Sequence, residues 1–368
     1  MSQASATRIT DLHEICIARL RDCLDPQSGL FARQIRHGQW APTLGTESIT
    51  SSAICLIGID RAGIPLREVV ADPAGLCTRL AARAGEVRYP GGLGLVLWAG
   101  SALRAASPLA LLAKAGLDAA GLEHVIPSLT TMEVAWMVSG LLHAEEPALR
   151  SARTRALREL ESRLVQPTLV FRHASTAAPW RHRLRGRIAN FADQVYPLQA
   201  FAFAATVLGG QDRRVLADRC GARLVAAQGP LGQWWWHHDA VTGKVVESYP
   251  VYSVHQHSMA PMALRALALA GGQDHAAAAA RSRAWLHANE LCIDMVEPTN
   301  GIIWRSIKRD ESRIGQQLRH GRILLAKPPS AEANPRFTLN REIRPYEWGW
   351  LLYATALENG PIPPGHIA

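Results

Sequence analysis

Residues 231–272 hold a dense collection of side chains that could bind and transform a ligand. The segment reads LGQWWWHHDAVTGKVVESYPVYSVHQHSMAPMALRALALAGG and contains three consecutive tryptophans, four histidines, two tyrosines and two carboxylates. This mixture is typical of a binding loop, because aromatic faces stack on a ligand while imidazoles and carboxylates supply hydrogen bonds and protons. We therefore predict a ligand site here.

The aromatic residues favour a polar, ring-shaped ligand. Tryptophan is abundant, at eleven residues against six phenylalanines, and indole faces stack on the flat C–H face of a sugar ring. Sugar hydroxyls need amide, carboxylate or guanidinium partners, and Arg305 could also meet an anionic group. The predicted binding residues are Trp234, Trp235, Trp236, Tyr249, Tyr252, His255, Gln256, Gln194, Trp304, Arg305 and Trp348. Three adjacent tryptophans cannot all face one cavity, so at least one must pack elsewhere.

Candidate acids and bases lie at or near the starts of apolar segments. Asp193 either caps a helix or projects its carboxylate toward a ligand. Glu347 lies inside an apolar segment, where burial raises a carboxyl pKa toward general-acid range unless an ion pair, for example with Arg344, opposes it. We predict Asp193 and Glu347 as the catalytic pair. Asp239, which could equally be a turn former, and His257 are the reserve candidates.

The histidine spacings do not favour a metal. His255 and His257 fall on different faces of a helix, and His237 and His238 are adjacent, so neither pair suits one ion. We expect no metal and no cofactor. One of His255 and His257 could serve as a base or as a hydrogen-bond partner for the substrate.

Composition narrows the class of protein. The chain has 368 residues, six scattered cysteines without a Cys-x-x-Cys pair, and no run approaching the roughly 20 apolar residues that span a bilayer. We expect a cytoplasmic protein without a membrane span. The net charge of +9 concentrates in 172–187 and 305–322, without a nucleic-acid-binding motif. A solvated basic face is the favoured interpretation, with contact to an anionic substrate as the alternative.

Two kinds of helix alternate along the chain. Amphipathic, charged segments are predicted at 8–24, 66–84, 108–120, 147–164, 211–228 and 274–292. Segments that are apolar nearly all round and rich in small residues are predicted at 46–59, 91–105, 130–143, 193–208, 254–271 and 345–357. A helix that is apolar on every side is buried on every side.

Six such pairs predict an all-α fold: a single α/α toroid over residues 1–368, with inner helices around a bowl and outer helices shielding them. Small residues let the inner helices approach closely. The loops before the inner helices should share one rim, and they carry Trp40, Glu47, Tyr89, Thr130, Asn190, Asp193, Tyr249 to His257 and Tyr346 to Trp348. Glu47 and Glu133 would add to a polar floor. The irregular, basic segments 165–192 and 293–344 are predicted rim insertions.

This alternation resembles the six-hairpin α/α superfamily, which includes glycoside hydrolases, polysaccharide lyases, the N-acylglucosamine 2-epimerase group, and terpenoid cyclases with protein prenyltransferases. The segment 344–352, RPYEWGWLL, is similar to the last inner helix of the sugar epimerases, although both histidines of their His-Pro-Gly-His element are absent. Gly38-Gln39-Trp40 is similar to a Gln-Trp repeat of terpenoid cyclases, but the Asp-x-Asp-Asp and Asp-Asp-x-x-Asp motifs are absent.

Residues and resemblance together predict a carbohydrate-active enzyme that handles a saccharide or glycoconjugate in the bowl. A glycoside hydrolase or lyase-like step by inward carboxylates is the leading mechanism. The alternatives are a terpenoid or prenyl-chain enzyme, epimerisation through histidine bases, and a non-catalytic glycan-binding toroid.

Overall fold

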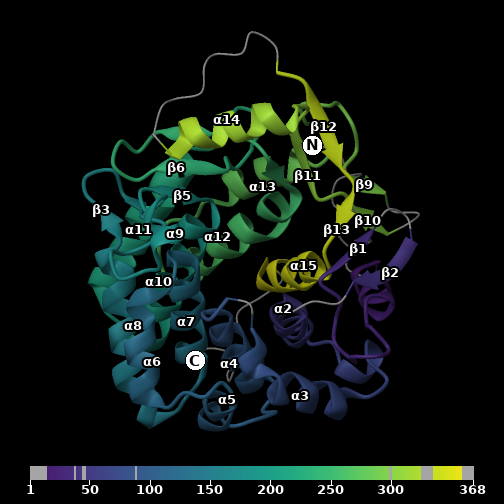
Figure 1. The fold of residues 1–368 in the computed structure, drawn as a ribbon, viewed down its shortest axis with the longest axis vertical. Coiled ribbons are helices and arrows are strands. Elements are labelled where there is room, and N and C mark those ends of the chain that lie inside the picture. The colour runs from purple at the N-terminus through teal and green to yellow at the C-terminus, as the bar shows by residue number, and fades with distance from the viewer. Residues whose placement is uncertain are drawn as a thin grey trace.

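Six apolar helices form a closed ring in the computed structural model, which describes residues 15–36, 39–43, 47–87, 89–297, 301–324 and 335–358 (Figure 1). They are α2 (Glu47–Arg61), α4 (Gly92–Ala102), α7 (Thr131–His143), α10 (Ala192–Leu208), α12 (Ala260–Leu269) and α15 (Pro345–Glu358). Each contacts the next, and α15 returns to contact α2. The prediction of an α/α toroid with six inner helices is confirmed. The predicted segment 254–271 begins with a π-helical turn, His255–Met259, ahead of α12.

Charged helices pack outside this ring. They are α3 (Pro73–Ala82), α5 (Pro108–Lys114), α6 (Ala119–Val125), α8 (Arg150–Ser162), α11 (Gln211–Ala226) and α13 (Ala276–Ala284). Side chains of Asp72, Ser107 and Asp118 accept backbone hydrogen bonds at the starts of α3, α5 and α6, which fixes where these helices begin. Short 3-10 helices occupy Leu66–Glu68, Ala84–Glu86, Ile126–Ser128 and Pro147–Leu149. Residues 15–22 are helical, and the start of the segment predicted at 8–24 lies outside the described residues.

Glycines let inner helices approach to backbone contact. A Cβ placed on Gly58 of α2 would lie 2.0 Å from the carbonyl oxygen of Gly349 of α15. A Cβ on Gly140 of α7 would lie 2.1 Å from the carbonyl oxygen of Gly94 of α4. The small residues noted in the inner segments therefore have a direct packing role.

In the described part of the chain, short antiparallel strands form five small sheets in the connections between the helices. Three three-stranded sheets have the orders β13-β1-β2, β12-β11-β8 and β5-β6-β7, and two two-stranded sheets pair β3 with β4 and β9 with β10. The strands are β1 (Gln34–Arg36), β2 (Gln39–Thr43), β3 (Leu164–Val165), β4 (Val170–Phe171), β5 (Ile188–Asn190), β6 (His237–Asp239), β7 (Val245–Glu247), β8 (Val251–Tyr252), β9 (Val296–Glu297), β10 (Ile302–Ile303), β11 (Ser306–Arg309), β12 (Phe337–Asn340) and β13 (Glu342–Ile343).

The segments predicted as irregular rim insertions contain much of this strand structure, together with two helices. The helix α9 (Trp180–Arg183) lies in 165–192, and α14 (Arg313–Leu324) lies in 293–344. Registry places Asn190 opposite His237 and Ile188 opposite Asp239, so segment 165–192 is joined to the tryptophan-rich segment by β5 and β6. Among the described residues, no helix is both long and apolar enough to cross a bilayer.

Candidate active site

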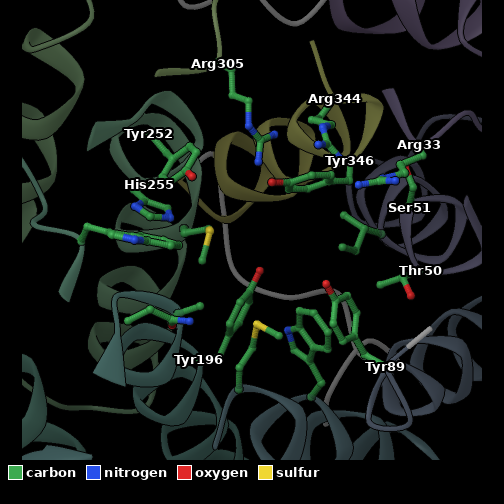
Figure 2. A pocket seen from close by; sticks show the side chains of 17 residues that line it. Arg33, Thr50, Ser51, Tyr89, Tyr196, Tyr252, His255, Arg305, Arg344 and Tyr346 are labelled. Atoms are coloured by element: carbon green, nitrogen blue, oxygen red, sulfur yellow. The ribbon is translucent and has the colours of Figure 1, made fainter. Parts of the chain in front are cut away.

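A cavity of about 330 Å³ opens where several inner helices begin (Figure 2). Its volume falls at the lower end of the range for small-molecule sites. Inner helices α2, α7, α10 and α15 contribute to its wall, and loops of the rim complete it. The lining residues are Arg33, Thr50, Ser51, Ile54, Tyr89, Met132, Trp136, Asn190, Ala192, Tyr196, Trp236, Tyr252, His255, Met259, Arg305, Arg344 and Tyr346.

Three guanidinium groups, from Arg33, Arg305 and Arg344, line the same side of this cavity, as Figure 2 shows. No Asp or Glu belongs to the lining formed by the described residues. Two carboxylates behind the wall are bonded to these arginines: Glu347 accepts a hydrogen bond from Arg305 at 3.0 Å, and Glu342 accepts one from Arg344 at 2.5 Å. The lining itself therefore presents guanidinium groups and no carboxylate from the described residues, which suits an anionic ligand.

Arg305 is the centre of this arrangement. Its guanidinium carbon lies 5.0 Å from the ring centroid of Tyr252, and Figure 2 shows the group between Tyr252 and Tyr346. Burial alone would lower the pKa of Arg305, but Tyr346, Glu347, Tyr252 and Glu342 together raise it. The arginine is thus held in its charged form where a ligand could reach it.

The neutral groups of the lining have pKa values set mainly by burial. Burial raises the pKa of Tyr346 to about 12, although Arg305 opposes the shift. Burial, with help from the charge of Arg305, lowers the pKa of His255 well below its ordinary value. A protonated phenol and an unprotonated imidazole therefore line one cavity, and together they could donate and accept a proton.

Four predicted site residues line the cavity: Trp236, Tyr252, His255 and Arg305. The first three belong to the segment that attracted attention in the sequence. His255 lies between aromatic rings, 5.8 Å by centroids from Trp236 and 5.1 Å from Tyr252. Its Nδ1 is buried and has no hydrogen-bond partner in the described part of the chain.

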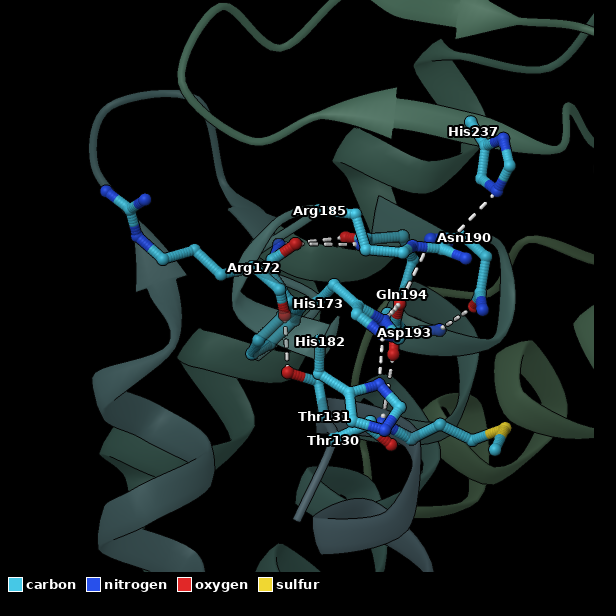
Figure 3. Close-up of polar contacts among 12 residues, drawn as sticks. Thr130, Thr131, Arg172, His173, His182, Arg185, Asn190, Asp193, Gln194 and His237 are labelled. Atoms are coloured by element: carbon cyan, nitrogen blue, oxygen red, sulfur yellow. Dashed lines mark hydrogen bonds and ion pairs between the residues drawn. The ribbon is translucent and has the colours of Figure 1, made fainter. Parts of the chain in front are cut away.

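Asp193 does not project into the bowl, contrary to expectation (Figure 3). The carboxylate is fully buried, and its Oδ1 accepts the backbone N–H of Met132 at 3.0 Å. Its Oδ2 accepts the N–H of Asn190 at 3.0 Å and lies 2.8 Å from Nδ1 of His173. His173 in turn faces Nδ1 of His182 at 3.4 Å. Asp193 thus connects the start of α10 to α7 by accepting backbone N–H groups. This role is close to that of the helix cap given as its alternative interpretation.

The other predicted catalytic residues also lie behind the lining. Asp239 accepts hydrogen bonds from Arg187 at 2.9 Å and Thr242 at 2.8 Å, which makes it the turn former of the alternative interpretation. His257 is buried with its Nδ1 2.5 Å from the hydroxyl oxygen of Ser258, and burial lowers its pKa to about 3. Glu347 forms an ion pair, which was its alternative interpretation, and its partner is Arg305.

The remaining predicted binding residues pack into the protein rather than facing the cavity, because each finds an internal partner. Trp234 stacks on Phe191, and the indole of Trp235 meets the edge of Tyr249. Of the three adjacent tryptophans, only Trp236 lines the cavity, consistent with the limit expected from sequence. The others are buried or bonded to protein: Tyr249 to Glu290, Gln256 to Tyr252, Gln194 to Phe171, Trp304 to Glu297, and Trp348 within the core.

Sequence reasoning assigned no site role to several lining residues, including Arg33, Tyr196 and Trp136. Tyr89, Asn190 and Tyr346 were expected at the rim, because each lies in or beside a loop that precedes an inner helix, but no specific binding role was predicted for them. Arg33 carries no such signal, since it precedes the short strand β1. No group of three or more His, Cys, Asp or Glu residues suited to a metal ion occurs within the described ranges.

The chain is similar in fold to unsaturated glucuronyl hydrolases. One, described as specific for heparin, superposes with a TM-score of 0.60 and 12% identity over 96% of each chain. The enzyme from Bacillus sp. GL1, described as responsible for glycosaminoglycan degradation, gives a TM-score of 0.55 and 14% identity, covering 95% of this chain and 94% of that chain. A glycosidase variant gives a TM-score of 0.52 at 12% identity, covering 98% of this chain and all of the other.

The sequence itself matches no protein-family model and no curated protein. At these identities the comparisons establish the α/α toroid of glycoside hydrolases as the fold, and they leave the chemistry to be argued from this chain's own residues.

Proposed function

We propose that the protein is a carbohydrate-active enzyme that binds a uronate-containing saccharide and cleaves it by a lyase-like elimination. The observation that carries this proposal is the cavity lining, which presents the guanidinium groups of Arg33, Arg305 and Arg344 and, among the described residues, no Asp or Glu side chain. The aromatic faces of Trp136 and Trp236 suit a sugar ring, and hydroxyl groups of Thr50 and Ser51 suit its hydroxyls.

The arginines would neutralise the carboxylate of the uronate. With that charge neutralised, the proton on the carbon next to the carboxylate becomes more acidic, because the electron pair left behind can delocalise into the carboxyl group. Arg305 is placed for this role, since its guanidinium lies between two lining tyrosines, and it would share its charge between the ligand and Glu347.

His255 would act as the base and Tyr346 as the acid. The unprotonated imidazole takes the proton from the carbon, a carbon–carbon double bond forms, and the bond to the leaving glycosidic oxygen breaks. The phenol of Tyr346 gives its proton to that oxygen. The low pKa of His255 and the pKa of about 12 for Tyr346 put both groups in the required protonation states near neutral pH.

A hydrolase that uses two carboxylates has less support. Such enzymes place two carboxyl groups across the scissile bond, and neither Asp193 nor Glu347 lines the cavity. Glu133 is also committed, accepting hydrogen bonds from Thr130 and from the N–H of Gly91. The side chain of Glu47 lies outside the described residues.

The fold neighbours add an analogy in the same direction. Two of them are described as unsaturated glucuronyl hydrolases, so they act on a uronate residue. A glycosidase-like toroid with a cationic cavity fits a saccharide of the same charge class.

A test separates elimination from hydrolysis. The protein is incubated with a panel of uronate-containing and neutral oligosaccharides, while ultraviolet absorbance and new reducing ends are measured together. Elimination raises both signals with uronates only, because the new double bond is conjugated with the carboxylate. New reducing ends without an absorbance gain would indicate hydrolysis.

Ligand-induced thermal shifts test the alternatives that the product assay does not detect. A shift with a saccharide but no product would indicate a non-catalytic glycan-binding toroid. A magnesium-dependent shift with a prenyl diphosphate alone would overturn the saccharide proposal and favour the terpenoid alternative.

A further inference from the structure

Four large apolar side chains stand out on the surface. Trp180 is 68% exposed, Leu184 63%, Ile314 70% and Leu318 67%, the highest values for large hydrophobic residues within the described ranges. Each pair is four residues apart on or next to a helix, which places its members on one face: Trp180 and Leu184 at α9, and Ile314 and Leu318 on α14. We call these four residues the rim patch.

Both helices of the rim patch are fixed to the β5-β6-β7 sheet. After α9 the chain enters β5, and Arg187 donates to Asp239 of β6 at 2.9 Å. On the other helix, Ile323 packs against Ile188 of β5 and Val246 of β7. Arg319 of α14 also pairs with a carboxylate of β7. Figure 1 shows α14 and α9 beside this sheet. Both apolar pairs are thus attached to the same sheet.

Basic residues outnumber acidic ones in and next to the two helices of the rim patch. Neither α9 nor α14 contains an Asp or Glu, and the whole segment 172–187 has none. Arg181 and Arg183 of α9 are exposed. Before α14 lie exposed Asp310 and Glu311, and Arg319 of α14 donates to Glu311 at 3.1 Å, so the charges of this bonded pair offset each other.

We propose that the rim patch docks the protein onto an anionic lipid surface. Exposed Trp, Leu and Ile side chains gain by entering the boundary between headgroups and acyl chains, while flanking arginines attract anionic headgroups. A saccharide chain would need aromatic faces and hydrogen-bond donors, but it gains little from Ile314 and Leu318. One apolar pair binds weakly, and two pairs attached to one sheet add their contributions when both reach the same surface.

Docking would bring the cavity close to the bilayer. Asn190 lines the cavity at the end of β5, six residues after Leu184 in the chain. Six residues span at most about 22 Å, even fully extended. A saccharide carried by a membrane lipid would therefore be displayed near the cavity, whatever reaction takes place there.

Vesicle sedimentation tests the proposal with the full chain. Vesicles of phosphatidylcholine alone are compared with vesicles that also contain phosphatidylserine, at low and raised salt. We expect binding only to the phosphatidylserine vesicles, weaker at raised salt. The double variant Trp180→Ser/Ile314→Ser, which removes one side chain from each helix, should bind at least about tenfold more weakly.

A matched control is Val215→Ser/Leu231→Ser, which replaces two exposed apolar residues outside the rim patch and should bind like the wild type. Circular dichroism verifies that every variant is folded. Absence of binding to anionic vesicles would overturn the proposal, as would an equal loss in the control. Self-association without lipid that the double variant abolishes would also overturn it, since the rim patch would then join two copies of the chain.

Discussion

At the scale of single residues, Arg305 is shared between an internal carboxylate and the cavity. It donates to Glu347 at 3.0 Å, and burial of Glu347 raises the pKa of that carboxyl to about 7 despite the arginine. Protonation of Glu347 removes a negative charge that competes with a bound anion for Arg305. We therefore expect this ion pair to influence ligand affinity as well as to act as a structural contact.

The first prediction concerns the pH dependence of binding. Above pH 7 Glu347 is ionised, and below it the carboxyl is neutral, so affinity for a uronate saccharide should rise as the pH falls through about 7. The expected gain is on the order of tenfold, from one charge removed beside a partly buried site. Titration calorimetry at several pH values, with the amide of the same saccharide as the neutral ligand, provides the measurement.

Glu347→Gln should keep the tight binding at every pH in that window, because its side chain has the shape of the protonated acid. The neutral ligand should show no comparable slope. A wild-type affinity that is flat through pH 7, or that falls as the pH is lowered, would be incompatible with this role of Glu347.

The second prediction separates the acid from the binding residues. Tyr346→Phe removes the proton that the leaving oxygen needs but keeps the ring, so kcat should fall by roughly a hundredfold or more with little change in KM. Tyr353→Phe is the control, because Tyr353 lies on the same helix, is buried and does not line the cavity. Initial rates of ultraviolet absorbance provide the measurement. Equal losses in both variants would show a structural effect only.

The sequence showed which residue types gather near the site, but it did not show which way each side chain points. Trp236, Tyr252 and His255 were found because they lie in a segment too polar and aromatic for a core. Asp193 was correctly placed near a helix start, but α10 is apolar on every face and has no polar stripe to show which side meets the cavity. Its orientation depends on hydrogen bonds to Met132 and Asn190, which belong to the tertiary structure.

At the scale of elements, helices were predictable and strands were not. The contrast between charged and uniformly apolar segments extends over ten or more residues in most helices, long enough for a helical period to appear. The described strands have two to five residues, too few to show alternation. Several also pair with distant segments, as β1 does with β13 and β8 with β11.

The third prediction concerns the link between an outer helix and the loop before an inner one. Arg163, buried directly after α8, donates to the carbonyl oxygens of Leu129 at 2.7 Å and Pro127 at 3.3 Å, and to Glu159 at 3.0 Å. Arg163→Met leaves the carbonyl oxygen of Leu129 and the carboxylate of Glu159 without this donor, while Pro127 keeps the hydroxyl of Ser175. The free energy of unfolding should therefore fall by about 3 kcal/mol. Urea denaturation measures this change.

Arg158→Met is the matched control for that variant, since Arg158 is on the same helix but exposed. It should change the free energy of unfolding by less than about 0.5 kcal/mol. If the two variants were equally stable, the hydrogen bonds of Arg163 would have no net value to the fold.

At the scale of the whole molecule, the toroid depends on a contact between the two ends of the sequence. The ring closes where α15, near the end of the chain, packs on α2, near its beginning. The helices meet through Gly58 and Gly349, and the backbone of α15 leaves no room for a side chain at Gly58. Closure also positions the site, because Thr50 and Ser51 of α2 face the same cavity as Tyr346 of α15.

Gly58→Ala should therefore loosen both the ring and the cavity. Its Cβ would lie 2.0 Å from the carbonyl oxygen of Gly349, so the helices must separate, and the free energy of unfolding should fall by at least about 2 kcal/mol. Gly321→Ala on α14 is the control, because a Cβ there meets nothing within 4 Å, and it should be neutral or stabilising by up to about 1 kcal/mol through helix propensity. Urea denaturation of both variants, with saccharide affinity measured in parallel, checks the link between closure and site. If Gly58→Ala kept full stability and affinity, the contact between α2 and α15 would not be what holds the two walls of the cavity together.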